Sequence, residues 1–217
     1  MSYSAYNLDT NAAKQADAGG RIDQSGKYVG HFKSVEFVTS KKGTQGLEFQ
    51  FETDGKEYAN FTIWTISATG DKLSGFAQVN AIMTCAGVRS LTPTDQKIEK
   101  YDFEVKQKIQ QLCTVAPELA NKPIGVLLQR ENYLNSNGDE KHQMNFFAAF
   151  NAQSEFIAKE IIDKKTKPEE LEKITARLMQ NPVVQRKQGG QSSNAAANDA
   201  FAQAGRKAAD LDDDLPF

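Results

Sequence analysis

The chain has 217 residues, of which 39% are hydrophobic and 9% aromatic, and its formal net charge is −2. That length fits one domain of ordinary size with appended segments, and the apolar fraction excludes a chain that is disordered throughout. No apolar run reaches the roughly 20 residues of a membrane-spanning helix, and residues 1–20 lack the hydrophobic stretch of a signal peptide. We therefore expect a cytoplasmic protein with no membrane partner.

Composition divides the chain into four segments. Residues 1–26 are polar and predict a flexible N-terminal arm, whereas residues 27–184 hold nearly all the apolar periodicity and predict the folded domain. Residues 185–210 are rich in Gln, Gly, Ser, Asn and Ala and predict a disordered linker, followed by an acidic tip at residues 211–217. From Gly189 onward there are two cations and five anions, or −3. The rest of the chain then carries +1, which allows a positive groove if its charges segregate by face.

The first part of the domain predicts a three-stranded antiparallel meander. Residues 28–39 are rich in aromatic and β-branched side chains, and residues 47–51 alternate apolar with polar side chains in the period of a half-buried strand. Asp54 and Gly55 then signal a hairpin turn into a third strand at residues 56–66.

The remainder of the domain predicts helical material, two strands and two final helices. Apolar residues recur at three- and four-residue spacing in two central segments, and strand character returns on both sides of a turn-rich loop. The predicted elements are helices at 73–83 and 103–113, strands at 124–130 and 143–150, and helices at 154–163 and 168–179.

Three strands, helical material and two strands follow one another in the order of an oligonucleotide-binding (OB) fold. We therefore predict a mainly β (α+β) protein. Its expected architecture is a five-stranded OB-fold barrel with a helical insertion between strands 3 and 4 and with C-terminal helices.

The two faces of the third predicted strand differ in character. Ala59, Phe61 and Ile63 alternate onto a core face, which leaves Tyr58 and Trp64 on the opposite face among polar neighbours. Aromatic rings on an open face can stack on unpaired bases, which contributes about 1 to 3 kcal/mol per base. Trp64 can alternatively pack beneath the helical insertion or the C-terminal helices. The sequence leaves both interpretations of Trp64 open.

Basic residues gather near the same predicted strands. Cations hold the phosphates of a nucleic acid and release its counterions, and the loop between the last two strands of an OB fold also flanks the binding face. A lysine at a hairpin tip can equally be a solvated charge. The predicted DNA-binding residues are Arg21, Lys27, Lys33, Lys41, Lys42, Lys56, Tyr58, Trp64, Arg130 and Lys141.

Motifs for catalysis are weak. Asp95, Glu104 and Lys106 faintly suggest the carboxylates and lysine of a metal-dependent nuclease, but they lie in a stretch of helical period where such side chains form ordinary solvent-exposed pairs. His31 and His142 have no partners at metal-ligand spacing. We expect no enzyme activity, catalytic residue, metal site or cofactor, with the nuclease as the alternative to exclude.

The acidic tip sets three mutually repelling carboxylates ahead of an apolar end. A receptor can offer an apolar pocket for the last ring, a cation for the α-carboxylate and a basic ridge for the aspartates. An acidic run alone would only aid solubility, but a Pro–Phe ending suits that role poorly. The predicted partner-binding residues are Asp212, Asp213, Asp214, Leu215, Pro216 and Phe217.

This ending resembles the acidic tip of bacterial and phage single-stranded-DNA-binding proteins, which recruit replication and repair enzymes through it. Leu215 stands where the bacterial proteins usually have Ile, and the folded domain is similar only in general terms to the single-stranded-DNA-binding proteins of phage replication and recombination modules. The resemblance implies a protein that coats unpaired DNA without strong sequence preference and recruits partner enzymes through its tip. The helical segments depart from the compact bacterial pattern, so a monomer or a homodimer fits as well as a tetramer.

Two other functions stay open on the sequence. One is a strand-annealing recombination protein, and the other is an adaptor or inhibitor of a host replication enzyme that does not bind DNA. In the DNA-binding interpretation the negative, tethered tip is also expected to occupy the positive groove when DNA is absent.

Overall fold

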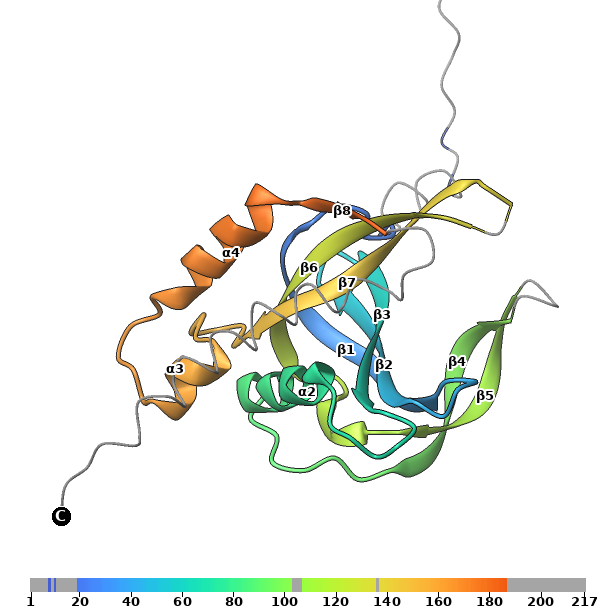
Figure 1. Cartoon of the computed structure of the whole chain (residues 1–217), viewed down its shortest axis with the longest axis horizontal. Helices are drawn as coiled ribbons and strands as arrows, with labels where there is room; N and C mark the ends of the chain where they lie inside the picture. Colours follow the sequence, from blue (N-terminus) through green and yellow to red (C-terminus); the bar gives the residue numbers. More distant parts are fainter. Residues whose placement is uncertain (1–7, 9, 11–18, 103–106, 136, 187–217) are drawn as a thin grey trace, which may run out of the picture.

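Figure 1 shows the computed structural model of the chain, which describes residues 8, 10, 19–102, 107–135 and 137–186. The acidic tip, nearly all of the predicted linker, and residues 1–7, 9 and 11–18 of the predicted arm lie outside these residues. The described part is mainly β, an open antiparallel sheet with a few helices. Its strands are β1 (Gly26–Thr39), β2 (Gln45–Thr53), β3 (Tyr58–Ile66), β4 (Thr94–Asp102), β5 (Gln107–Val115), β6 (Pro123–Leu134), β7 (Glu140–Phe150) and β8 (Val183–Gln185). Its helices are α2 (Ser74–Cys85), α3 (Ala158–Ile162) and α4 (Glu170–Gln180), with a 3-10 turn η1 (Pro117–Leu119).

Strand β1 joins two groups of strands. From Gly30 onward it pairs with β2, and residues 26–31 pair on the other edge with β6. β3 follows β2, β7 follows β6, and the short β8 pairs with β6 in parallel. A register shift between Phe32 and Ser34 marks a bulge, the kind of irregularity that bends a strand. Within the described residues β3 and β7 are edge strands of an open sheet, so the closed barrel expected from the sequence is not seen.

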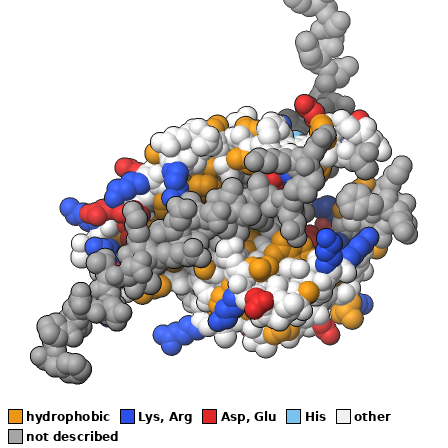
Figure 2. Space-filling view, viewed as in Figure 1, with side chains coloured by type: hydrophobic (Ala, Val, Ile, Leu, Met, Phe, Trp, Pro, Cys, Tyr) orange, Lys and Arg blue, Asp and Glu red, His pale blue; other side chains and the backbone are white. Residues whose placement is uncertain are grey.

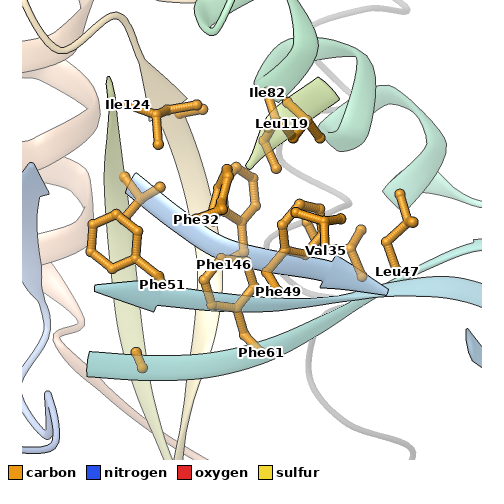
Figure 3. Close-up of a cluster of buried hydrophobic side chains, with 14 of the residues drawn as sticks. Phe32, Val35, Leu47, Phe49, Phe51, Phe61, Ile82, Leu119, Ile124 and Phe146 are labelled. Atoms are coloured by element: carbon orange, nitrogen blue, oxygen red, sulfur yellow. The ribbon is translucent and has the colours of Figure 1, made fainter. Parts of the chain in front are cut away.

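Phenylalanine rings form the centre of the hydrophobic core (Figure 3). Phe49 and Phe61 stack with ring centroids 5.2 Å apart, and Phe61 stacks on Phe146 at 5.8 Å. Such pairs add about 0.5 to 1.5 kcal/mol each beyond the burial of their area. The second pair connects β3 to β7, which no strand pairing joins within the described residues. Ala59, Phe61 and Ile63 are all buried, which confirms the predicted core face of the third strand.

The helices pack on two different clusters. α2 contributes Val79 and Ile82 to the phenylalanine core, whereas α4 packs Leu171 and Leu178 with Phe150 in a second cluster. In Figure 1, α3 and α4 lie together on one side of the sheet and α2 lies across one end of it. The structure confirms the predicted helices that correspond to α2, α3 and α4, although α3 is shorter than predicted.

Residues 20–22 extend the fold ahead of its predicted start at residue 27. The backbone N–H of Tyr58 donates to the carbonyl of Gly20 at 3.0 Å, and the N–H of Ile22 donates to the carbonyl of Tyr58 at 2.8 Å. Ile22 is only 2% exposed and belongs to the main core. This stretch, which the sequence places in the arm, therefore packs beside the first residue of β3.

The predicted central helix at 103–113 is wrong, because the chain forms a β-hairpin there. β4 and β5 pair antiparallel along their described length. The apolar residues that suggest a helical period also fit a strand, since the less exposed Ile109 and Cys113 share one face with the buried Val115. The more exposed Lys108, Gln110 and Leu112 lie on the other face. Pairing with β4 makes this segment a strand and not a helix, and the spacing of apolar residues alone does not reveal that partner. We call this β4–β5 hairpin the ribbon.

The ribbon curves back over the rest of the sheet. Among the described residues it joins β1 through one strand pair, Glu36 with Val115. Lys100 lies six residues beyond the root pair Thr94–Val115, roughly 20 Å along a straight strand. Its Nζ nevertheless lies 2.6 Å from Glu36 Oε2 and 3.7 Å from Glu48 Oε2. These contacts require a bend, and the curvature of the ribbon is visible in Figure 1.

Candidate nucleic-acid interface

The side of β3 opposite the phenylalanine core carries both predicted stacking rings, and we call the non-core side of β1, β2 and β3 the outer face. Tyr58, Asn60, Thr62 and Trp64 lie on it, and Tyr58 keeps 46% of its surface exposed. Trp64 is partly exposed and lies against β2, since a Cβ on Gly46 would come within 2.8 Å of Trp64 Cε3. Trp64 belongs to neither hydrophobic cluster, so the structure favours the open-face interpretation of this ring.

Two lysines flank Tyr58 and share one carboxylate. Glu52 of β2 lies opposite Tyr58 in the strand pairing, and its carboxylate oxygens lie 3.2 Å from Lys33 Nζ and 3.3 Å from Lys56 Nζ. Burial acts to raise the pKa of Glu52, but hydrogen bonds from the two lysines and their charges outweigh it and lower that pKa. The carboxylate is therefore ionised at neutral pH and faces two ammonium groups. One positive charge is left in excess beside the ring.

The ribbon brings a third lysine to this group. Lys108 Nζ lies 2.9 Å from Glu99 Oε1 on the adjacent strand of the ribbon, and its side chain is 66% exposed. The hydrogen bond to Glu99 and its charge raise the pKa of Lys108, and the nearby Tyr58 and Glu52 raise it further. Sequence reasoning missed Lys108 because it assigned this segment to a helix. We define the Tyr58 cluster as Tyr58, Lys33, Glu52, Lys56 and Lys108.

A cleft of about 340 Å³ lies next to Trp64, between β3 and β7. Asn60 and Trp64 line it from β3, Gln143 and Asn145 line it from β7, and Arg186 lines it from the residue after β8. A ring, three amides and a guanidinium thus meet in one open hollow. Such groups can stack on flat ligands and hydrogen-bond their polar edges, as unpaired bases require.

A fully buried carboxylate supports the β7 side of this cleft. Glu131 of β6 has no exposed surface, and Arg186 Nη2 lies 2.7 Å from its Oε2. The side-chain amides of Gln143 and Asn145 also donate to Glu131, at 2.8 and 3.2 Å. The Arg186 guanidinium lies 4.7 Å from the centroid of the Tyr133 ring, a cation–π contact. Arg186 therefore ties the chain after β8 to β6, and Glu131 positions the amides that line the cleft.

The structure separates Lys27 and the first hairpin loop from the Tyr58 cluster. Lys27 forms an ion pair with Glu155, and its ammonium lies 5.2 Å from the centroid of the Phe150 ring in the second cluster. It lies six residues along β1 from the nearest lysine of the Tyr58 cluster, roughly 20 Å away. Lys41 and Lys42 are exposed in the loop before β2, at the Trp64 end of the outer face.

The remaining predicted cations are Arg21, beside the Tyr58 end of β3, Arg130 on β6 and Lys141 on β7. Arg21 is exposed and bridges to Tyr58 through the backbone. The Arg130 guanidinium donates to two nearby oxygens at 2.8 and 3.1 Å. Burial lowers the pKa of His142, and the charges of Arg130 and Arg21 lower it further, which places both arginines near this imidazole. Lys141 is exposed on the same strand as His142.

Positive charge stands in small groups on the face of the molecule that Figure 2 shows. On the side shown in Figure 2, the Lys and Arg side chains of the described residues stand in separate small groups with carboxylates between them. The Tyr58 cluster, counted with Glu99, holds three ammonium groups and two carboxylates. At this cluster the attraction for phosphate is therefore concentrated around an exposed ring.

Among the residues that the structure describes, no group of three or more His, Cys, Asp or Glu side chains is placed to hold a metal ion. The described helices include none with the length and apolar character needed to span a membrane. In comparisons with known proteins, no family model matches the chain and no curated protein matches its sequence.

Proposed function

We propose that the protein binds single-stranded DNA without strong sequence preference and coats unpaired DNA during phage replication or recombination. In this proposal it is a binding protein and not an enzyme. The observation that carries the proposal is the outer face of β3, where the exposed Tyr58 and the partly exposed Trp64 share one open surface with lysines.

Rings and lysines together match the two parts of an unpaired strand. Every base has a flat face, so stacking on Tyr58 and Trp64 tolerates any sequence, while ammonium groups attract phosphates. The two rings stand six residues apart on β3, roughly 20 Å, so one strand must run extended to reach both. A duplex keeps its bases stacked inside and cannot offer them to either ring, which favours the single strand.

The arrangement of strands supports an OB fold as the finer description. β1, β2, β3, β6 and β7 follow in the order of its five strands, and α2 lies between the third and the fourth. β1 pairs with both β2 and β6, and the Phe61–Phe146 contact brings β3 toward β7. The second and third strands of that fold commonly form the binding face. They are the strands that carry Glu52, Tyr58 and Trp64 here.

The proposal gives residues 211–217 a separate function, although they lie outside the described residues. Their aspartates and Phe217 are proposed to recruit a replication or repair enzyme. Arg186, the last described residue, lines the cleft beside Trp64, so residues 187–217 continue from the edge of the proposed DNA site. A tip tethered there raises the local concentration of its partner at the coated strand, and it can itself reach the site when DNA is absent.

Titration with a labelled unpaired oligonucleotide and with a duplex of the same sequence tests the DNA proposal. We expect the single strand to bind at least about tenfold more tightly, and its affinity to fall with salt at a log–log slope of about −0.7 per phosphate contact. The three lysines of the Tyr58 cluster then predict a slope of about −2. Fluorescence of Trp64, the one tryptophan of the chain, should change on binding. Equal affinity for the duplex, or binding that ignores salt, would contradict the proposal.

Deleting residues 211–217 should leave single-strand affinity unchanged or higher while abolishing capture of the partner enzyme, because the tip repels phosphate and carries the docking ring. A Phe217→Ala variant is the matched control, since it keeps every aspartate and removes only the ring. Oligonucleotide titration and pull-down with purified replication enzymes measure the two effects. A large loss of DNA affinity on deletion would refute this division of roles. Tip-dependent capture without any DNA binding would instead support the adaptor function.

A further inference from the structure

We propose that the ribbon is the second wall of the DNA site and that Lys108 contacts the phosphate of the nucleotide whose base stacks on Tyr58. This inference rests on the proposed DNA binding and adds a residue and an element to it. It also gives the ribbon a function that its packing does not explain, because its described part pairs with the rest of the sheet at Glu36–Val115 alone.

The position of the ribbon is set by a different lysine. Lys100 is bound between Glu36 and Glu48, and its side chain is only 23% exposed. This contact holds the ribbon against the outer face and uses the Lys100 ammonium for structure. Lys108 is 66% exposed by comparison and has Glu99 as its ion-pair partner among the described residues. Lys100 is therefore the positioning residue and Lys108 the one available to a ligand.

Charge around Tyr58 identifies an anionic strand as the occupant. Lys33 and Lys56 share Glu52, and Lys108 adds a third ammonium group from the ribbon side. Lys108 stands next to Ile109, the strand partner of Lys100, so the contacts of Lys100 with Glu36 and Glu48 hold this part of the ribbon over the outer face. The charge of Lys108 acts on both Tyr58 and Glu52 there, so the ribbon and the sheet contribute to one electrostatic site. An exposed ion pair such as Lys108–Glu99 contributes little stability, so a phosphate can take the place of the carboxylate at little cost.

Lys173 of α4 offers a closely matched control for Lys108. Its Nζ lies 2.8 Å from Glu170 Oε1 and its side chain is 67% exposed, against 2.9 Å and 66% for Lys108. We expect Lys108→Ala to weaken single-strand binding about fivefold and to lower the magnitude of the salt slope by about 0.7, the value for one phosphate contact. Lys173→Ala should change neither quantity.

A double variant separates direct contact from the effect of the exposed partner carboxylate. Removing Lys108 alone leaves Glu99 free to repel phosphate, so Lys108→Ala with Glu99→Gln removes that repulsion. If Lys108 contacts phosphate, the double variant keeps the reduced slope. If the affinity and the salt slope of the double variant both return to the values of the unaltered protein, Lys108 does not contact phosphate and only neutralises Glu99.

The positioning function of Lys100 has a distinct signature. Lys100→Met should weaken binding by about fivefold without lowering the salt slope, because no phosphate contact is removed directly. Lys100→Arg should restore affinity by renewing the bridge to the two carboxylates. If the unaltered protein binds the single strand and the Lys108 and Lys100 variants bind as well as Lys173→Ala, the inference fails while the proposed function stands. If the unaltered protein does not bind the single strand, both fail.

Discussion

Replacing Tyr58 and Trp64 together by alanine is expected to weaken single-strand binding by about 2 to 6 kcal/mol, since each lost ring removes about 1 to 3 kcal/mol of stacking. This corresponds to roughly 30-fold to 20,000-fold in Kd. Both rings lie outside the hydrophobic clusters, and Tyr58 is nearly half exposed. The free energy of unfolding should therefore fall by about 1 kcal/mol or less. Oligonucleotide titration and a thermal melt of the same preparation measure the two quantities.

The conservative pair Tyr58→Phe and Trp64→Phe is the control for this experiment. Phenylalanine keeps a flat face for stacking and loses only the hydroxyl and the indole N–H, so most of the affinity should remain. Loss of affinity in proportion to a collapse in melting temperature would mean that the rings support the fold and not the ligand. Unchanged affinity in the alanine pair would place the DNA site elsewhere on the molecule.

Arg186→Ala is expected to destabilise the protein by about 3 kcal/mol, because removing one partner of a buried ion pair leaves the other charge poorly compensated. Glu131 has no exposed surface, while Arg186 is partly exposed and also lies over the Tyr133 ring. Gln143 and Asn145 still donate to Glu131 in the variant, but both amides are neutral. Denaturant unfolding followed by far-UV circular dichroism measures the change.

Glu131→Gln combined with Arg186→Met tests the cause of this loss. The double variant removes both charges and keeps similar side-chain volumes, and replacing a buried pair by neutral residues is often close to neutral for stability. It should therefore recover most of the stability that Arg186→Ala loses. If the double variant is at least as unstable as Arg186→Ala, the stability is lost because β8 is no longer anchored, and not because Glu131 has lost its partner charge.

The local pattern of apolar and polar residues was enough to predict most of the strands. Alternation predicted that Ala59, Phe61 and Ile63 face the core and Tyr58 and Trp64 do not, and burial follows that division. The hairpin signals and the helix corresponding to α2 were also correct. Each of these features depends on residues close in the chain, where spacing reports the local conformation directly.

The errors arose where the pairing between segments decides the structure. The ribbon is a hairpin because β4 and β5 pair with each other, although its apolar spacing also fits a helix. Whether the strands close into a barrel depends on how the edges of β3 and β7 meet, and local patterns carry no such information.

The residues of the candidate site also divide into those that local sequence predicts and those that only the folded chain brings together. Lys33 and Lys56 were predicted because they lie on or beside the first three predicted strands, and the fold brings both lysines and Tyr58 to Glu52. Lys27 was predicted on the same grounds, but a partner 128 residues away, Glu155, holds it on another surface. Lys108 and the buried Glu131 were missed, because their importance follows from contacts that only the folded chain makes.

The attachment of the ribbon has a consequence for how such a protein can diversify. A hairpin that joins the sheet through one strand pair can change in length or in sequence without disturbing the phenylalanine rings that stabilise the domain. Two carboxylates on β1 and β2 suffice to orient whatever replaces it, provided that a cation is kept at the point of contact. In the proposed site, ligand preference can then evolve on the ribbon almost independently of stability, with the sheet beneath it left unaltered.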